Sequence, residues 1–127
     1  MAVGAMLTVP LVALGCSKRA GPAGGAVRMP PGQLVSRQAR EKGRELFMEN
    51  CAICHGKDAD GHGPRSAGMI PPPANLTVPL WSDSASAPKI YQAIHDGVAG
   101  SAMPSWKSLD DDQIWDLVAY VRSLGNP

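Results

Sequence analysis

The chain contains few aromatic residues, few cysteines and almost no net charge. Only 5% of its 127 residues are aromatic, with a single Phe, so the side chains alone supply a thin core. A folded chain this short often needs an additional stabilising element beside its hydrophobic core. Three cysteines are too few, and odd in number, for a framework made of disulfides alone. The net charge of +1, from 12 basic and 11 acidic residues, argues against a nucleic-acid partner and against a disordered tail.

The sequence also lacks a hydrophobic run of membrane-spanning length. The apolar segment at residues 1–15 is interrupted by Pro10, whereas a spanning helix needs about 20 apolar residues. The order Leu-Val-Ala-Leu-Gly before Cys16 resembles a bacterial lipoprotein signal. That resemblance implies removal of the segment and lipid attachment at Cys16, which would hold the protein at the outer face of a bacterial membrane. A secretory signal cleaved further along and an uncleaved anchor stay open as alternatives.

Residues 16–35 hold this cysteine and a segment dominated by Gly, Pro and Ala, without hydrophobic periodicity. Such a composition is typical of a flexible linker. As a coil it would span roughly 25 Å, so that a tethered domain could reach partners near the membrane. We expect the globular domain at residues 36–127.

The motif Cys51-Ala-Ile-Cys54-His55 carries the chemistry of the chain. Two cysteines at this spacing, followed by histidine, are the pattern of covalent haem attachment. The cysteines can form thioethers with the vinyl groups at one edge of a porphyrin, and the histidine can bind the iron. A redox disulfide and half of a zinc site are the alternatives. A zinc site needs further ligands, for which only His62 and His95 remain, and no βαβ pattern favours a thioredoxin-like site.

Hydrophobic periodicity predicts an all-α domain. Residues 37–50 are rich in good helix formers, and Gly43 and Phe47 lie four apart on the apolar face. Residues 110–124 repeat apolar side chains at helical spacing. A shorter helix is expected at residues 88–95. Gly43 should let the first and last helices approach closely, with Tyr120 or Val121 as the opposing side chain.

Two further local features complete this interpretation. Ser108 and Asp111 have the spacing of a capping box at the start of the last helix. Residues 55–80 show no periodicity and contain many Gly and Pro residues. We expect this stretch to form an irregular loop around the lower edge of a haem.

Taken together, the motif and the helices resemble class I cytochrome c over about residues 36–126. The resemblance implies a small fold of three to four helices wrapped around one haem c, bound covalently through Cys51 and Cys54. In that family a downstream methionine, often followed by proline, takes the sixth position on the iron. Here the matching pair is Met103-Pro104.

Several side chains compete for this sixth position. Met103 follows His55 at a distance that allows the chain to cross to the opposite face of the haem. Met69 comes soon after His55 and is expected to lie on the histidine side. His95 could give a bis-histidine site, and an open or water-bound iron is a further alternative. Met48 lies on the first helix and is expected in the core.

The resemblance also implies the surroundings of the haem. A proline carbonyl after the motif often accepts the ring N–H of the iron-bound histidine. Pro64 is the first candidate here and Pro71 the second. Candidates for lining the pocket or binding the haem propionates are Trp81, as in the family, and also Trp106 and Arg65.

These features predict a single-electron carrier rather than an enzyme, exported and tethered at the outer face of the membrane. Methionine sulfur would favour the ferrous state of the iron. We expect redox proteins of a respiratory or photosynthetic chain as partners, met in transient encounters. One alternative is a fixed haem subunit of a larger membrane complex. Another is a haem gas sensor or enzyme in which Met103 is displaceable.

Overall fold

The computed structural model describes residue 1, residues 28–78 and residues 85–125. Within these ranges the chain forms only helices, which confirms the all-α prediction. The helices are η1 (Gln33–Val35), α1 (Arg37–Asn50), α2 (Ala52–His55), α4 (Ala87–Asp96) and α5 (Asp111–Leu124). The three longer ones agree with the predicted helices to within one residue at each end. None of the described helices has both the length and the apolar character needed to cross a bilayer.

Helix α1 starts at a side-chain cap. The hydroxyl of Ser36 accepts a hydrogen bond from the backbone N–H of Ala39 at 3.3 Å, which satisfies one of the free N–H groups of the first turn. The buried face of the helix consists of Ala39, Gly43 and Phe47. The spacing of these residues matches the periodicity that predicted the helix.

Helix α5 has a capping box, although not the predicted one. The carboxylate of Asp110 accepts the backbone N–H of Gln113 at 2.8 Å, and the Gln113 side chain accepts the N–H of Asp110 at 3.0 Å. The prediction of Ser108 and Asp111 is therefore wrong by two positions. The glutamine side chain is long enough to reach back over one turn, which an aspartate side chain does less well.

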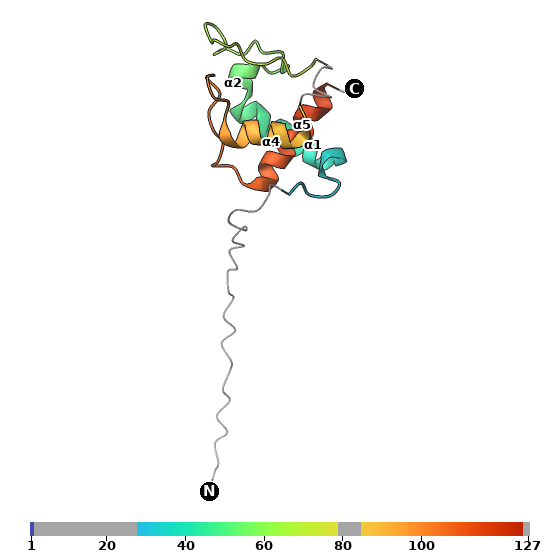
Figure 1. The fold of residues 1–127 in the computed structure, drawn as a ribbon. Helices are drawn as coiled ribbons and strands as arrows, with labels where there is room; N and C mark the ends of the chain where they lie inside the picture. The colour runs from blue at the N-terminus through green and yellow to red at the C-terminus, as the bar shows by residue number, and fades with distance from the viewer. Residues whose placement is uncertain (2–27, 79–84, 126–127) are drawn as a thin grey trace.

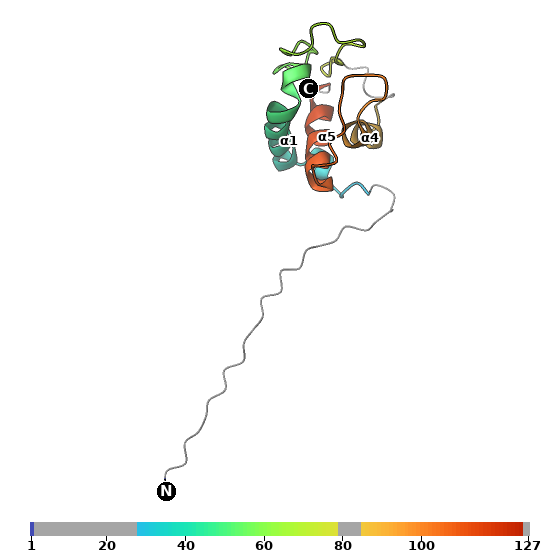
Figure 2. The ribbon, with the colours of Figure 1, turned by 90° about the vertical axis from the view of Figure 1, so that its left-hand side faces the viewer.

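Helices α1 and α5 make the most extensive contact between elements, and Figure 2 shows them side by side with α4 beyond α5. The contact depends on Gly43. A Cβ added there would overlap the carbonyl oxygen of Asp116 and come within 2.9 Å of the Cβ of Tyr120. This confirms that Gly43 permits the close approach, with Tyr120 as the opposing side chain. Val121, the other predicted neighbour, is not among the nearest atoms.

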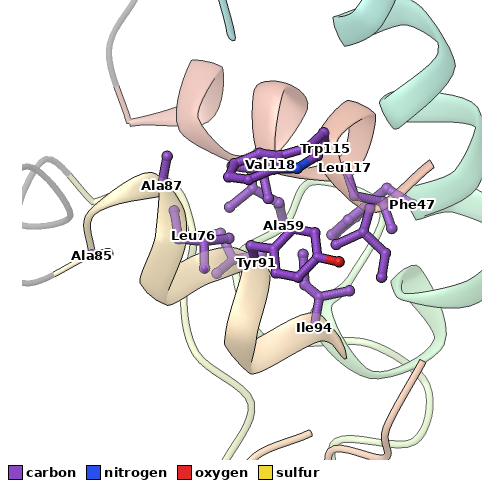
Figure 3. Packing of buried hydrophobic residues seen from close by; sticks show 13 residues of the cluster. Phe47, Ala59, Leu76, Ala85, Ala87, Tyr91, Ile94, Trp115, Leu117 and Val118 are labelled. Atoms are coloured by element: carbon purple, nitrogen blue, oxygen red, sulfur yellow. The ribbon is translucent and has the colours of Figure 1, made fainter. Parts of the chain in front are cut away.

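The core lies between these helices and α4 (Figure 3). Tyr91 of α4 packs against Trp115 of α5, with ring centroids 4.8 Å apart. Phe47 of α1 packs against Tyr120 of α5 at 5.3 Å. The largest side chains with less than 2% of their surface exposed are Trp115, Phe47, Ile114, Leu117 and Val118. Four of these five come from α5, which is therefore the central element.

The folded part begins before residue 36. The side chain of Gln33, in η1, donates a hydrogen bond to Asp116 of α5 at 2.7 Å, and Leu34 packs against the core. Gln33 and Leu34, which the sequence pattern assigned to the linker, thus contact the domain. The Gly- and Pro-rich composition around them concealed this short 3-10 helix.

The described chain from residue 56 to residue 78 has no helix or strand, as predicted. It folds back over α2 and lies at one end of the molecule (Figure 1). The N–H of Gly63 donates to the Cys54 carbonyl at 3.0 Å, and the N–H of Arg65 donates to the Ile53 carbonyl at 2.8 Å. These bonds satisfy carbonyls at the end of α2 that the short helix leaves free.

Candidate functional site

The Cys-x-x-Cys-His motif forms a single helical turn directly after α1. The N–H of Cys51 donates to the Phe47 carbonyl at 2.8 Å and so continues the α1 pattern. The N–H groups of Cys54 and His55 donate to the Cys51 carbonyl at 3.1 and 2.9 Å. Neither cysteine is in a disulfide. The motif is therefore held by the end of a well-packed helix.

A largely apolar cavity of about 230 Å³ opens beside this turn. Cys51 and His55 line it together with Met103, which comes from the segment after α4. Among the described residues that line the cavity, Lys89 of α4 is the one lysine or arginine. The apolar wall includes Phe47, Leu76, Ile90, Ile94, Leu117 and Val121.

The residues around this cavity fit a haem c. An apolar wall suits the porphyrin, while imidazole and thioether are two of the side-chain groups that bind haem iron. Met103 follows His55 by 48 residues in the sequence, yet it lines the same cavity as His55 and Cys51. The family pattern also places these residues together.

The ring of His55 is oriented by a backbone carbonyl. Its Nδ1 lies 3.0 Å from the carbonyl oxygen of Ala74. Because a carbonyl can only accept, Nδ1 carries the proton and Nε2 is left with its lone pair for a metal. The predicted acceptors, Pro64 and Pro71, are therefore wrong. The N–H of Leu76 donates to the Ala59 carbonyl at 2.8 Å, and this bond holds the segment that brings Ala74 to the ring.

Burial affects the acidity of the Cys51 thiol. Removal from water, together with the nearby Cys54, raises the pKa of the Cys51 thiol to about 11. A nucleophilic redox cysteine has the opposite property, because its pKa is lowered by positive surroundings. The site thus does not favour the thioredoxin-like alternative.

The remaining predicted residues lie outside the cavity or outside the described chain. Cys54 is half-buried on α2, and Pro64 and Arg65 are exposed in the following loop. Met48 is 40% exposed on α1, so it is not the core residue that was predicted. The predicted residues that do not line the cavity include Cys54, Pro64, Arg65, Met69, His95 and Trp106. Cys16 and Trp81 lie outside the described residues.

Sequence reasoning missed two features of the site. The Ala74 carbonyl has no side-chain signature, and no pattern in the sequence could have identified it. Lys89 lies four residues before Ala93 on the same face of the helix, and both residues line the cavity, but no pattern in the sequence identified this face as the one that meets the site.

Comparisons with known proteins show the family to which the chain belongs. The cytochrome c family model matches residues 40–125. The cbb3-type cytochrome c oxidase subunit CcoP of Azospirillum brasilense is 40% identical over 88 residues, which are 68% of this chain and 29% of that subunit. The corresponding subunit FixP of Bradyrhizobium diazoefficiens is 35% identical over 85 residues, or 66% of this chain and 27% of the subunit. The matched region thus covers less than a third of the length of these relatives.

Solved structures show the same fold. A chain of the Kuenenia stuttgartiensis reducing HAO-like protein complex matches with a TM-score of 0.60 and 30% identity, over 66% of this chain and 41% of that one. Cytochrome CL of Methylophaga aminisulfidivorans matches with a TM-score of 0.55 and 26% identity, over 71% of this chain and 55% of that one. The haem-attachment motif and the family match together mean that haem c is bound through Cys51 and Cys54. The chain belongs to the cytochrome c family.

Proposed function

We propose that this protein carries single electrons with its haem iron bound between His55 and Met103. The observation that carries the proposal is the cavity that these two side chains line together with Cys51. Bound haem c supplies an iron that changes its oxidation state by one electron without bond chemistry in a substrate. The protein's contribution is to fix the two ligands and to control the surroundings of the iron.

Each ligand side chain has a distinct role. The hydrogen bond from His55 Nδ1 to the Ala74 carbonyl fixes the tautomer of the ring and increases its basicity as a ligand. The Met103 thioether is neutral and favours Fe(II), which raises the reduction potential. The apolar wall limits the access of water. With both axial positions filled, the iron is suited to electron transfer rather than to binding small ligands.

The place of action that we propose is the outer face of a bacterial membrane, with lipid on Cys16 as the tether and redox proteins as partners. Similarity to the CcoP and FixP subunits favours a second candidate, in which the domain is a fixed part of a larger respiratory complex. The chemistry at the site is the same in both cases. The second candidate changes only the lifetime of the contact with the partner.

A spectroelectrochemical titration of the full chain, produced with haem-attachment machinery, tests the proposed function. We expect one Nernstian wave of a single electron, with the same midpoint in the presence and absence of carbon monoxide. A two-electron wave would indicate a dithiol couple instead. A midpoint that rises under carbon monoxide would indicate an open iron and would overturn the electron-carrier proposal.

Two further measurements separate the possible settings. If Cys16 carries the lipid, a Cys16→Ser variant should move from the detergent phase to the aqueous phase while the haem spectrum stays unchanged. Gentle detergent extraction should then recover the wild-type protein either alone, as a tethered carrier, or in constant ratio with other membrane subunits, as a fixed component.

A further inference from the structure

The segment that carries Met103 is held against the C-terminal end of α4. The N–H of Trp106 donates to the Ile94 carbonyl at 3.1 Å, and the hydroxyl of Ser105 donates to the His95 carbonyl at 2.7 Å. Both bonds use carbonyls of the last helical turn, which have no partner inside the helix. The chain after Met103 thus caps α4.

The backbone of Met103 itself is bound on both sides. Its N–H donates to the hydroxyl of Ser101 at 3.1 Å, and its carbonyl accepts the N–H of Val98 at 3.3 Å. These bonds close a tight loop between the end of α4 and the methionine. The position of the Met103 backbone is therefore set by the residues directly after the helix.

Gly97 is the point at which this loop touches the helix end. Its φ is +78°, a conformation that residues with a side chain rarely adopt. A Cβ added there would come within 2.9 Å of the carbonyl oxygen of Met103, of the carbonyl carbon of Pro104 and of the nitrogen of Ser105. All three are backbone atoms, so no side-chain rotation can relieve the contact.

We propose that Gly97 is a positioning residue for the sixth ligand of the haem iron. The missing side chain lets the Met103 backbone approach α4, and this approach keeps the thioether at the wall of the cavity. The inference rests on the proposed binding of iron by His55 and Met103. It adds that the strength of the Met103 bond to iron is set by the packing between Gly97 and the backbone of residues 103–105.

Gly100 provides a matched control within the same loop. Its φ is +75°, nearly the same as that of Gly97, but a Cβ added at Gly100 meets no atom within 4 Å. Alanine at either position would have to adopt a positive φ, which residues with a side chain rarely do. Only alanine at position 97 also pushes against the methionine segment, so the pair separates this steric effect from the cost of a positive φ.

The experiment uses the ferric full-length holoprotein and measures the equilibrium affinity for added imidazole, which competes with Met103. The far-red absorption band typical of methionine bound to ferric haem is recorded in parallel. We expect Gly97→Ala to bind imidazole about tenfold more tightly than wild type, which corresponds to about 1.4 kcal/mol, with a weakened far-red band. Gly100→Ala should change the affinity by less than about threefold and leave the band intact. A purely structural role would move both variants alike.

Equal affinities for the two variants would overturn the proposal. If Gly97→Ala yields no folded holoprotein, Ser105→Ala replaces it, because loss of the hydroxyl frees the same segment with little strain. Ser105→Ala should bind imidazole more tightly than wild type. Ser105→Thr, which keeps a hydroxyl, should restore the wild-type affinity for imidazole. No change in Ser105→Ala would also overturn the proposal. A wild-type spectrum without the far-red band would instead refute the ligation by Met103, and with it the positioning role.

Discussion

Replacement of Gly43 by alanine brings two physical effects into direct conflict. Alanine has the higher helix propensity, which alone would stabilise α1 by about 1 kcal/mol. Against this, the new Cβ would overlap the Asp116 carbonyl oxygen on α5. A backbone carbonyl inside a helix cannot turn aside, so the two helices would have to separate.

The steric effect is expected to win. Overpacking of a filled core costs about 1–3 kcal/mol, and separation of the helices also weakens the contact of Phe47 with Tyr120, whose ring centroids are 5.3 Å apart. Such aromatic pairs contribute about 0.5–1.5 kcal/mol. After subtraction of the gain in propensity, Gly43→Ala should destabilise the protein by about 2 kcal/mol. For a domain of this size the midpoint of thermal unfolding should fall by roughly 8–16 °C.

Thermal unfolding of the full-length holoprotein, followed by far-ultraviolet circular dichroism, measures this effect. Gln38→Ala is the control, because Gln38 is exposed on the same helix and its replacement should change stability by less than about 0.5 kcal/mol. A Gly43→Ala protein as stable as wild type would refute the argument that the approach of α1 to α5 depends on this glycine.

Two further predictions concern α5. Asp110→Ala removes the N-cap of the helix and should lower the free energy of unfolding in urea by about 1 kcal/mol. Asp112 is exposed in the first turn, so Asp112→Ala should lower it by only a few tenths of a kcal/mol, through the helix dipole. Equal losses in the two variants would contradict the capping role of Asp110. Burial raises the pKa of Asp116 above its usual value, against the opposing hydrogen bond from Gln33. The stability that this shift contributes is present below the pKa of an aspartate in the unfolded chain, about 3.9. It is lost as pH rises through the pKa of Asp116 in the folded protein. Asp116→Asn keeps an acceptor for Gln33 and cannot ionise, so its stability relative to wild type should increase from acid to neutral pH; a difference that stays constant with pH would contradict the effect of burial.

The helices could be predicted from the sequence because their signals are local. Apolar spacing in α1 and α5 reports the face that is buried, and Gly43 identifies the contact between them. The start of α5 shows the limit of such signals. Two overlapping patterns fit a capping box there, and only the reach of the Gln113 side chain decides in favour of Asp110.

The candidate site could be predicted only where side chains carry the chemistry. The spacing of Cys51, Cys54 and His55 is specific enough to indicate haem attachment on its own. The acceptor for the His55 ring is a backbone carbonyl at Ala74, and any residue can provide one. It depends on how an irregular loop folds back, which periodicity does not encode.

The docking of Gln33 onto Asp116 illustrates a different limit. Residues 17–35 have the composition of a linker, yet Gln33 and Leu34 near the end of this segment contact the domain. A single hydrogen bond to a buried carboxylate and a few apolar contacts are enough to fix them. Composition averages over a segment and does not detect such a short contact.

We expect His55 and Met103 to be the two axial ligands of the haem iron. Optical spectra of the oxidised and reduced full-length protein, recorded beside a Met103→Ala variant, test this ligation. The wild type should be low-spin with the far-red band of methionine ligation, and the variant should lose the band and bind cyanide or carbon monoxide readily. A wild type that is already high-spin, or a Met103→Ala variant with an unchanged spectrum, would contradict it.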